Sequence, residues 1–461
     1  MVHYYVNSDT GNDANDGSEG NPVATVTQAF TLVNGIQLSD KGPHEIIITN
    51  DGVYNEGNLG FQPPLNFDTI VHIMAQTGSD TGLPVVTPTL QGSGSDGTTQ
   101  FCCMYVGEDW IIRGIKFEDW IPTVSNAILN QKSYGELTEP STIVELCEFT
   151  KVTGSCFTAD LGAAALPHFV IQNNTFHDIM VPSSSNTNIL EFTSPKRFYM
   201  YNNVFYDIQY GNVSARILNA IGDGNPENII SHNTFGTSSV QEGTTYNPTY
   251  AIHSYYSKFE YNIIYEQTAN TGIGTSTFAA IDNGETNYNL YYNVSGQSSY
   301  APFGGVNPPT GSSNNREIDP LFKGPLVGNN ANYKLASTSS PAFDAAIGSS
   351  DVTTDRTGVS RTTLDRTALN TGIFDIGAYE LTGLWNPDSE QPDNQRQIGG
   401  DFTINRLSNA SNQFIRGTGG ADSSTSLGRN VDQVPFSVGL NGAIPSAIIT
   451  LNKQPSGKKG S

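Results

Sequence analysis

The sequence has few charged residues and no long hydrophobic run. Asp, Glu, Lys and Arg make up 14% of the 461 residues, against about 25% in typical domains. Lys and Arg number 22 against 44 Asp and Glu, which gives a net charge of −22, and such a surface repels the phosphate backbone of a nucleic acid. No run of apolar residues is long enough to cross a bilayer. We therefore expect neither a nucleic-acid partner nor a membrane span.

Cysteine is also scarce. The chain has four cysteines, Cys102, Cys103, Cys147 and Cys156, whose spacing fits no metal site and which are too few to hold a disulfide scaffold. We expect buried free thiols rather than a bridge between Cys147 and Cys156.

Similar segments recur along the chain, each with an apolar run that closes on an aromatic or aliphatic residue. The closing residues are separated by 32, 27, 29, 30, 29 and 27 positions: Phe117, Phe149, Phe176, Phe205, Phe235, Ile264 and Tyr291. Each run is rich in Ile, Val, Phe and Tyr and predicts a β-strand. One strand cannot bury its own face, so we expect successive copies to stack as parallel sheets around an apolar core. The segments between the runs cannot supply the helix pairs of an ankyrin or tetratricopeptide array.

An asparagine recurs two residues before the closing positions, as Asn174, Asn203, Asn233, Asn262 and Asn289. Asparagine tolerates the left-handed backbone conformation, and its amide can form hydrogen bonds. We therefore expect these residues to turn the chain sharply in each coil and to form an amide ladder along the stack. A column repeated through five coils indicates scaffold geometry rather than a ligand site.

These repeats resemble the right-handed parallel β-helix proteins of the pectate-lyase-like superfamily, a fold found in phage tailspikes, virion surface proteins and bacterial surface proteins. Residues 4–17 and 21–29 are similar to the opening of such chains. Their closing motifs are similar to residues 319–322, 333–335, 340–344 and 375–380. The resemblance implies an all-β fold, namely a right-handed parallel β-helix solenoid with an N-terminal cap and a small C-terminal attachment element.

The charge distribution suggests where the solenoid ends. Residues 383–461 contain seven Lys and Arg against six Asp and Glu, a net charge of +1, which leaves −23 for the preceding residues. We expect the cap and first coils in residues 1–60, the β-helix in 61–382, and an attachment or oligomerisation region in 383–461.

Four carboxylates lie two residues after closing positions, at Asp119, Asp178, Asp207 and Glu266. Asp178 and Asp207 fall in adjacent coils, about 4.8 Å apart if they share a sheet. Glycoside hydrolysis uses two facing carboxylates about 5–10 Å apart. Asp178 and Asp207, with His177 and His232 beside them, are therefore the candidate catalytic residues. The alternative is that each aspartate only ends its strand by bonding to the turn backbone.

Two further sets of residues are candidates for binding. Outward-facing aromatic rings can stack on sugars, and cations can neutralise an acidic substrate, which gives the candidate substrate-binding residues Tyr206, Tyr265, Arg216 and Lys196. Asp9, Asp13 and Asn15 space oxygen atoms like the first half of a calcium loop, although Gly20 stands where such a loop has its glutamate. Asp and Asn also crowd ordinary turns. We expect no required cofactor, with Ca²⁺ as the one candidate ion.

The first residues lack the basic and apolar segments of a secretion signal, whereas proteins of this type usually act outside cells. Lysis of the host cell by a bacteriophage would release such a protein without a secretion signal. We therefore expect a trimeric virion-surface β-helix protein, on a phage tail or decorating a capsid, that contacts capsid or tail proteins and a host surface polysaccharide. Its location would be the virion, outside the cell after lysis. The alternatives are a polysaccharide lyase or glycoside hydrolase on the same scaffold, and a bacterial adhesin that is secreted or held at the cell surface.

Overall fold

The chain forms two compact units, Met1–Ala336 with Ser340–Glu380, and Ser337–Ser339 with Leu381–Ser461. The computed structural model describes residues 2–35, 43–56, 59–60, 71–78, 83–92, 102–105, 110–122, 127–132, 141–160, 168–182, 187–193, 195, 197–211, 215–221, 227–240, 251–266, 279–282, 284–294, 303–304, 314–328, 331–337, 339–343, 345–346, 352–357, 361, 374–381, 397–398, 402–404 and 415–417. Among these residues, no helix has the length and apolar character needed to cross a membrane.

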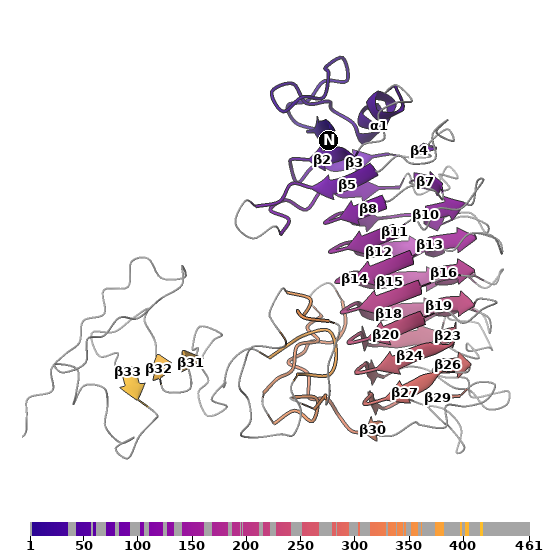
Figure 1. Ribbon diagram of the computed structural model, residues 1–461, viewed down its shortest axis with the longest axis vertical. Coiled ribbons are helices and arrows are strands. Elements are labelled where there is room, and N and C mark those ends of the chain that lie inside the picture. Colours follow the sequence, from indigo (N-terminus) through magenta and orange to yellow (C-terminus); the bar gives the residue numbers. More distant parts are fainter. Residues whose placement is uncertain are drawn as a thin grey trace, which may run out of the picture. The chain divides into compact units, whose positions relative to one another are not determined.

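The first unit is a parallel β-helix, and its described strands form three parallel sheets (Figure 1). The first sheet contains, in order, β1 (Val2–Val6), β2 (His44–Ile48), β5 (Val71–Ala75), β8 (Trp110–Arg113), β11 (Ser141–Glu145), β14 (His168–Gln172), β17 (Arg197–Tyr201), β20 (Glu227–Ser231), β24 (Ser257–Glu260) and β27 (Glu285–Asn287). The second contains β4 (Leu59–Gly60), β7 (Cys102–Tyr105), β10 (Ala127–Lys132), β13 (Ser155–Asp160), β16 (Asn188–Thr193), β19 (Arg216–Ile221), β23 (Ile252–Tyr255), β26 (Ala279–Asp282) and β29 (Phe303–Gly304).

The third sheet carries most of the residues discussed below. It contains β3 (Val53–Asn55), β6 (Thr89–Gln91), β9 (Lys116–Glu118), β12 (Glu148–Thr153), β15 (Thr175–Val181), β18 (Val204–Tyr210), β21 (Thr234–Phe235), β25 (Ile263–Tyr265), β28 (Leu290–Tyr292) and β30 (Arg316–Glu317), and β22 (Ser238–Val240) also pairs with β18. Each coil therefore adds one strand to each sheet, as the repeat predicts.

Among the described elements, one helix and one small antiparallel sheet are not part of the three parallel sheets. Helix α1 (Val26–Asn34) begins at Thr25, whose side chain accepts a hydrogen bond from the backbone N–H of Gln28, and its apolar side chains join the core of the solenoid. In the second unit, β31 (Gln397–Ile398), β32 (Phe402–Ile404) and β33 (Ile415–Gly417) form an antiparallel sheet. The capping role of the N-terminal segment and the attachment role of the C-terminal region stay predictions.

The closing residues of the repeat form one column in the core. Strand register aligns Phe117, Phe149, Phe176, Phe205 and Phe235 in successive coils. Their rings stack with centroids 4.9, 4.8, 4.6 and 5.2 Å apart and interplanar angles of 4–14°. The separation matches the spacing of paired strands, about 4.8 Å, so phenylalanine can occupy the same position in these five successive coils. Burial raises the pKa of the Cys147 thiol in this core to about 12, and both Cys147 and Cys156 are free, as expected.

The asparagine column forms the predicted amide ladder. All five asparagines are fully buried. The backbone N–H and the side-chain amide of Asn203 both donate to Oδ1 of Asn233 at 3.0 Å, and the amide also donates to the carbonyl of Ile171 at 2.8 Å. The same pattern joins each asparagine to the next, and the ladder extends one coil further than expected, to Asn315.

The expected left-handed conformation occurs one residue earlier than the ladder. The φ angle is +60° at Asn173, +55° at Asn202, +56° at His232, +57° at Tyr261 and +55° at Tyr288. The prediction that the ladder asparagines themselves adopt it is therefore wrong. The preceding residue makes the turn, and this leaves the asparagine side chain free to point along the axis into the column.

After the last coil the chain folds back over the outer face of the third sheet. We call the described parts of residues 318–336 and 340–380 the return segment (Figure 1). Its apolar side chains pack on the solenoid: Phe322 lies edge-on to Tyr265, and Phe374 lies edge-on to Tyr261. The described parts of residues 319–322, 333–335, 340–344 and 375–380 therefore lie along the solenoid wall.

Candidate functional site

The acidic residues singled out after the closing positions belong to a column of left-handed residues on the third sheet. The φ angles are +57° at Asp119, +52° at Lys151, +51° at Asp178, +51° at Asp207 and +47° at Glu266. We call these five residues the outer column. Aspartate tolerates this conformation better than most residues. The strands β15 and β18 continue through the bend, so Asp178 and Asp207 kink their strands rather than end them.

A pocket of about 490 Å³ opens beside this column. It is lined by Asp178, Ile179, Met180, Asp207, Gln209, Thr237, Ser238, Ser239 and Val327. The structure thus brings Asp178 and Asp207 to one cavity, as their positions in adjacent coils predicted. The tip of the return segment contributes Val327 to the wall, which the sequence did not reveal.

The Asp207 carboxylate accepts two hydrogen bonds, both from uncharged donors. Its Oδ1 accepts a hydrogen bond from the Thr237 hydroxyl at 2.9 Å, and its Oδ2 accepts one from the backbone N–H of Gly328 at 2.7 Å. Gly328 belongs to the return segment, whose nearby Leu326 carbonyl accepts a hydrogen bond from the Tyr333 hydroxyl at 2.6 Å. Asp207 therefore attaches the tip of the return segment to the pocket wall.

Asp178 has a different set of partners. Its Oδ2 lies 3.0 Å from Nδ1 of His177, and Nε2 of His177 lies 3.0 Å from Oε1 of Glu148. Thr150 Oγ1 is 3.3 Å from the same Nδ1. The His177 contact lowers the pKa of the Glu148 carboxyl, and the positive charges of Lys116 and Arg356 act in the same direction.

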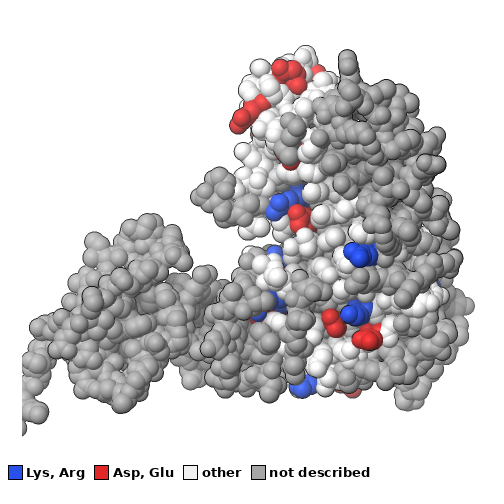
Figure 2. Space-filling view, viewed as in Figure 1, with Lys and Arg blue, Asp and Glu red and all other residues white. Residues whose placement is uncertain are grey.

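Sequence reasoning missed Glu148. The signal was present, because Glu148 stands directly before the closing residue Phe149, one coil before His177 in the same column of strands. Its partner Lys116 lies one coil earlier still, with Nζ 4.0 Å from Oε1 of Glu148. Figure 2 shows basic and acidic side chains beside one another at several points of the described surface.

The two candidate tyrosines lie under the return segment rather than at the pocket. Tyr206 is 5% exposed, and its ring stacks on His177 with centroids 4.8 Å apart and packs against Tyr333. Tyr265 is 9% exposed and packs against Phe322. Burial raises the pKa of Tyr206 and raises that of Tyr265 to about 12. The structure therefore places both rings in packing contacts, and neither lines the pocket.

The other candidates are not gathered at this pocket. His232 is fully buried in the turn between β20 and β21, where it stacks on Tyr261 and where burial holds its pKa well below 6.5. Arg216 lies on the second sheet and donates to Oδ1 of Asn219 at 2.6 Å. Lys196 lies outside the described residues.

The candidate calcium loop makes turn contacts. Oδ1 of Asp13 accepts hydrogen bonds from the backbone N–H groups of Ala24 and Thr25 at 2.9 and 3.0 Å, and the Asn15 amide donates to the Pro22 carbonyl at 2.8 Å. The backbone N–H of Asp9 donates to Oδ1 of Asn7 at 3.0 Å. In the described part of the chain, His, Cys, Asp and Glu form no group of three that could hold a metal ion. Calcium binding by this loop stays a prediction.

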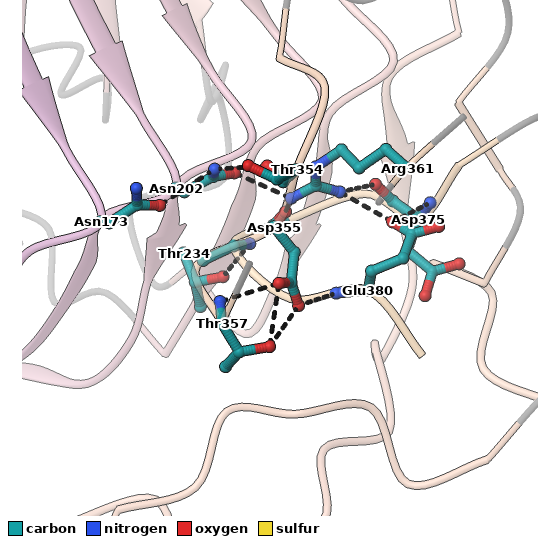
Figure 3. A network of polar contacts seen from close by, with 11 residues as sticks. Asn173, Asn202, Thr234, Thr354, Asp355, Thr357, Arg361, Asp375 and Glu380 are labelled. Atoms are coloured by element: carbon teal, nitrogen blue, oxygen red, sulfur yellow. Dashed lines mark hydrogen bonds and ion pairs between the residues drawn. The ribbon is translucent and has the colours of Figure 1, made fainter. Parts of the chain in front are cut away.

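A buried polar network fastens the return segment to the coils (Figure 3). The Arg361 guanidinium donates to Oε2 of Glu380 at 2.9 Å and to Oδ1 of Asn202 at 2.8 Å. The Asn202 amide in turn donates to the carbonyl of Thr354 at 2.8 Å. Arg361 and Glu380 are almost completely buried. Burial of Arg361 and Glu380 is tolerated only while both charges are present, since a lone buried charge is strongly destabilising.

No family model matches the sequence. No curated protein matches it either. Among solved structures, pectate lyase Pel9A is similar at 11% identity and a TM-score of 0.36, covering 82% of this chain and 96% of its own. The native GH136 lacto-N-biosidase from Eubacterium ramulus has 10% identity and a TM-score of 0.26, covering 68% of each chain. XylC in complex with xylose has 10% identity and a TM-score of 0.27, covering 83% of this chain and 99% of its own.

Proposed function

We propose that the pocket beside the outer column binds a neutral glycan. The observation that carries this proposal is its lining, in which two carboxylates from adjacent coils stand with the Gln209 amide and the hydroxyls of Thr237, Ser238 and Ser239. Such groups donate to and accept from sugar hydroxyls. Ile179, Met180 and Val327 supply apolar surface, as ligand pockets generally require.

The charge of the lining favours a neutral sugar over an acidic one. None of the described residues that line the pocket is Lys, Arg or His. A uronic acid would bring a third negative charge close to Asp178 and Asp207, and like charges within a few ångströms repel.

A panel of neutral and uronic-acid oligosaccharides, measured by isothermal titration calorimetry, tests this proposal. We expect binding of a neutral oligosaccharide, and Asp178→Asn should weaken it by about tenfold through loss of one charge-assisted hydrogen bond. The matched control is Glu145→Gln on the first sheet, where the carboxylate pairs with Arg113 and Gln172. Equal affinity in Asp178→Asn and wild type, or binding of uronic acids alone, would contradict the proposal.

Glycoside hydrolysis is a second candidate function, favoured by the equivalent positions of Asp178 and Asp207 in paired strands. Such strands lie about 4.8 Å apart, close to the ~5–5.5 Å between the carboxyl groups of retaining enzymes. New reducing ends in the wild type that disappear in both Asp178→Asn and Asp207→Asn would support hydrolysis by this pair, and the anomeric configuration of the first product would test retention. Binding without new reducing ends would restrict the protein to adhesion.

The virion setting expected from the sequence stays a prediction and is compatible with glycan binding. Light scattering after size-exclusion chromatography tests the trimer, and incubation with purified capsid or tail proteins tests the partners. A stable monomer that binds no virion component would contradict this setting and favour a secreted or cell-surface protein.

A further inference from the structure

The imidazole of His177 is clamped between two carboxylates. Nε2 lies 3.0 Å from Oε1 of Glu148 and Nδ1 lies 3.0 Å from Oδ2 of Asp178. His177 is 4% exposed, whereas the Asp178 side chain is 38% exposed at the pocket. The ring stacks almost parallel on Tyr206, with an interplanar angle of 6°, so it has little room to rotate away from either carboxylate.

The proton content of this ring decides how firmly Asp178 is held. A carboxylate only accepts hydrogen bonds, and an imidazole nitrogen donates only when it carries a hydrogen. Both contacts are therefore hydrogen bonds when both nitrogens are protonated. If the proton leaves Nδ1, its lone pair faces Oδ2 of Asp178 and that contact becomes repulsive, while the Thr150 hydroxyl, 3.3 Å from the same nitrogen, can turn to donate to it.

We propose that Glu148 and His177 are positioning residues that hold the Asp178 carboxylate against the pocket wall, so that glycan affinity falls when the His177 ring loses its Nδ1 proton at higher pH. This inference rests on the glycan binding proposed above. His177 is not among the residues that line the pocket, and it acts on the ligand through Asp178.

The groups around His177 make Asp178 the residue that responds to pH. The charged and titratable groups that face His177 or its partners are Lys116 of β9, Glu148 and Lys151 of β12, Asp178 of β15, Tyr206 and Asp207 of β18, and Tyr333 and Arg356 of the return segment. The partners of Asp207, the Thr237 hydroxyl and the Gly328 N–H, keep their hydrogens throughout the range in which a histidine titrates.

The first experiment measures affinity for the neutral oligosaccharide that binds best, from about pH 5 to pH 8. We expect the wild type to lose about tenfold in affinity across this range, the effect of one charge-assisted hydrogen bond. His177→Gln should bind weakly and equally at every pH, and Glu148→Gln should move the midpoint of the wild-type curve to lower pH. The matched control Glu145→Gln should follow the wild-type curve. Unchanged pH profiles in both variants would overturn the inference.

A second measurement follows the His177 ring by ¹⁵N NMR without any glycan. Both Glu148→Gln and Asp178→Asn should lower the midpoint of its titration, because each removes a carboxylate that stabilises the protonated ring. Identical midpoints in the two variants and the wild type would overturn the inference. If these midpoints move but no glycan binds at any pH, the proposed function fails and the positioning pair stands. If glycan binds with the same affinity at every pH, the proposed function stands and the inference fails.

Discussion

The asparagine ladder and the outer column run through the same coils, yet their side chains have different kinds of partner. In the ladder every residue makes the same pair of hydrogen bonds to the next asparagine. In the outer column the partner changes with the coil. Lys151 pairs with Glu118 at 2.8 Å, Asp178 faces His177, and Asp207 holds the tip of the return segment.

This difference separates scaffold from site in a repeat protein. A position whose neighbours are the same in each coil stabilises the stack and can be explained without a ligand. A position that keeps its backbone geometry while its side-chain partners change from coil to coil does not serve only to stabilise the stack. The pocket lies beside Asp178 and Asp207, two neighbouring members of the outer column that have different partners.

The largest expected effect comes from breaking the ladder at its centre. Asn233→Ala removes the acceptor of two hydrogen bonds from Asn203 and a donor to the carbonyl of Met200. Buried polar groups without partners each cost about 1–3 kcal/mol, so we expect the free energy of unfolding to fall by about 3–5 kcal/mol. Urea denaturation measures this loss. Asn315→Ala, at the partly buried end of the ladder, is the matched control and should cost about 1–2 kcal/mol; equal losses would contradict a ladder of buried rungs.

The next largest effect concerns the return segment. Arg361→Met leaves the Glu380 carboxylate buried without its partner, and we expect a loss of about 3 kcal/mol together with faster proteolysis of the return segment. The double variant Arg361→Met with Glu380→Leu should recover part of this stability, because it removes the Glu380 charge while Asp355 and Asp375 still lose the positive charge of Arg361. Limited proteolysis and urea denaturation of the two variants check this. A double variant as unstable as the single one would show that the charge pair is not what holds the segment.

A smaller effect should distinguish the two aspartates of the outer column. Asp207→Asn loses the charge-assisted part of both hydrogen bonds, since its amide oxygen can keep the Gly328 N–H only if the Thr237 hydroxyl turns from donor to acceptor, and it should cost about 1–2 kcal/mol. Asp178→Asn keeps the left-handed conformation that asparagine tolerates and should cost less than about 0.5 kcal/mol. Thermal unfolding of both variants at one pH tests the contrast. If Asp178→Asn is the less stable variant, the assignment of Asp207 as the anchor of the return segment is wrong.

The smallest effect at neutral pH concerns His232, whose contribution to stability changes only as the pH is lowered. Burial lowers the pKa of His232 well below 6.5, so the unfolded chain takes up a proton at a higher pH than the folded chain does. Stability from this residue is complete above about pH 6.5 and falls as the pH is lowered from there, by at most about 1.4 kcal/mol per pH unit. His232→Asn should flatten this decline, since Asn173 and Asn202 occupy the equivalent left-handed position in earlier coils. Denaturation midpoints between about pH 4 and 7 measure it; an unchanged slope would contradict the assignment to His232.

Much of the scaffold could be predicted because it is periodic. The spacing of Phe149, Phe176 and Phe205 set the register that the strands adopt, and the asparagine spacing predicted the ladder. The turn position was missed by one residue because Asn173 and Asn202 precede the ladder asparagines directly, while other residue types fill that position in later coils. Left-handed geometry is not confined to one residue type when the surrounding coils enforce it.

The candidate site was only partly predictable. Register alone brings Asp178 and Asp207 together, and it also brings Glu148 within reach of His177. The return segment could not be found in this way, because Gly328 bonds to a residue 121 positions earlier and Arg361 to one 159 positions earlier. No period links such residues. Their contacts depend on how a non-repeating chain packs on a completed solenoid.

The amide ladder also has a direction. At each step the earlier coil donates and the later coil accepts. The most recently folded coil therefore exposes the backbone N–H and the side-chain amide of its ladder asparagine. Both remain without an acceptor until the asparagine of the next coil folds onto them. Since translation delivers the N-terminal coils first, each one becomes the template on which its successor docks, and every bond formed polarises the next. This direction favours folding of the solenoid from its N-terminal end, and a chain cut short between coils would expose two unpaired N–H groups on its last complete coil.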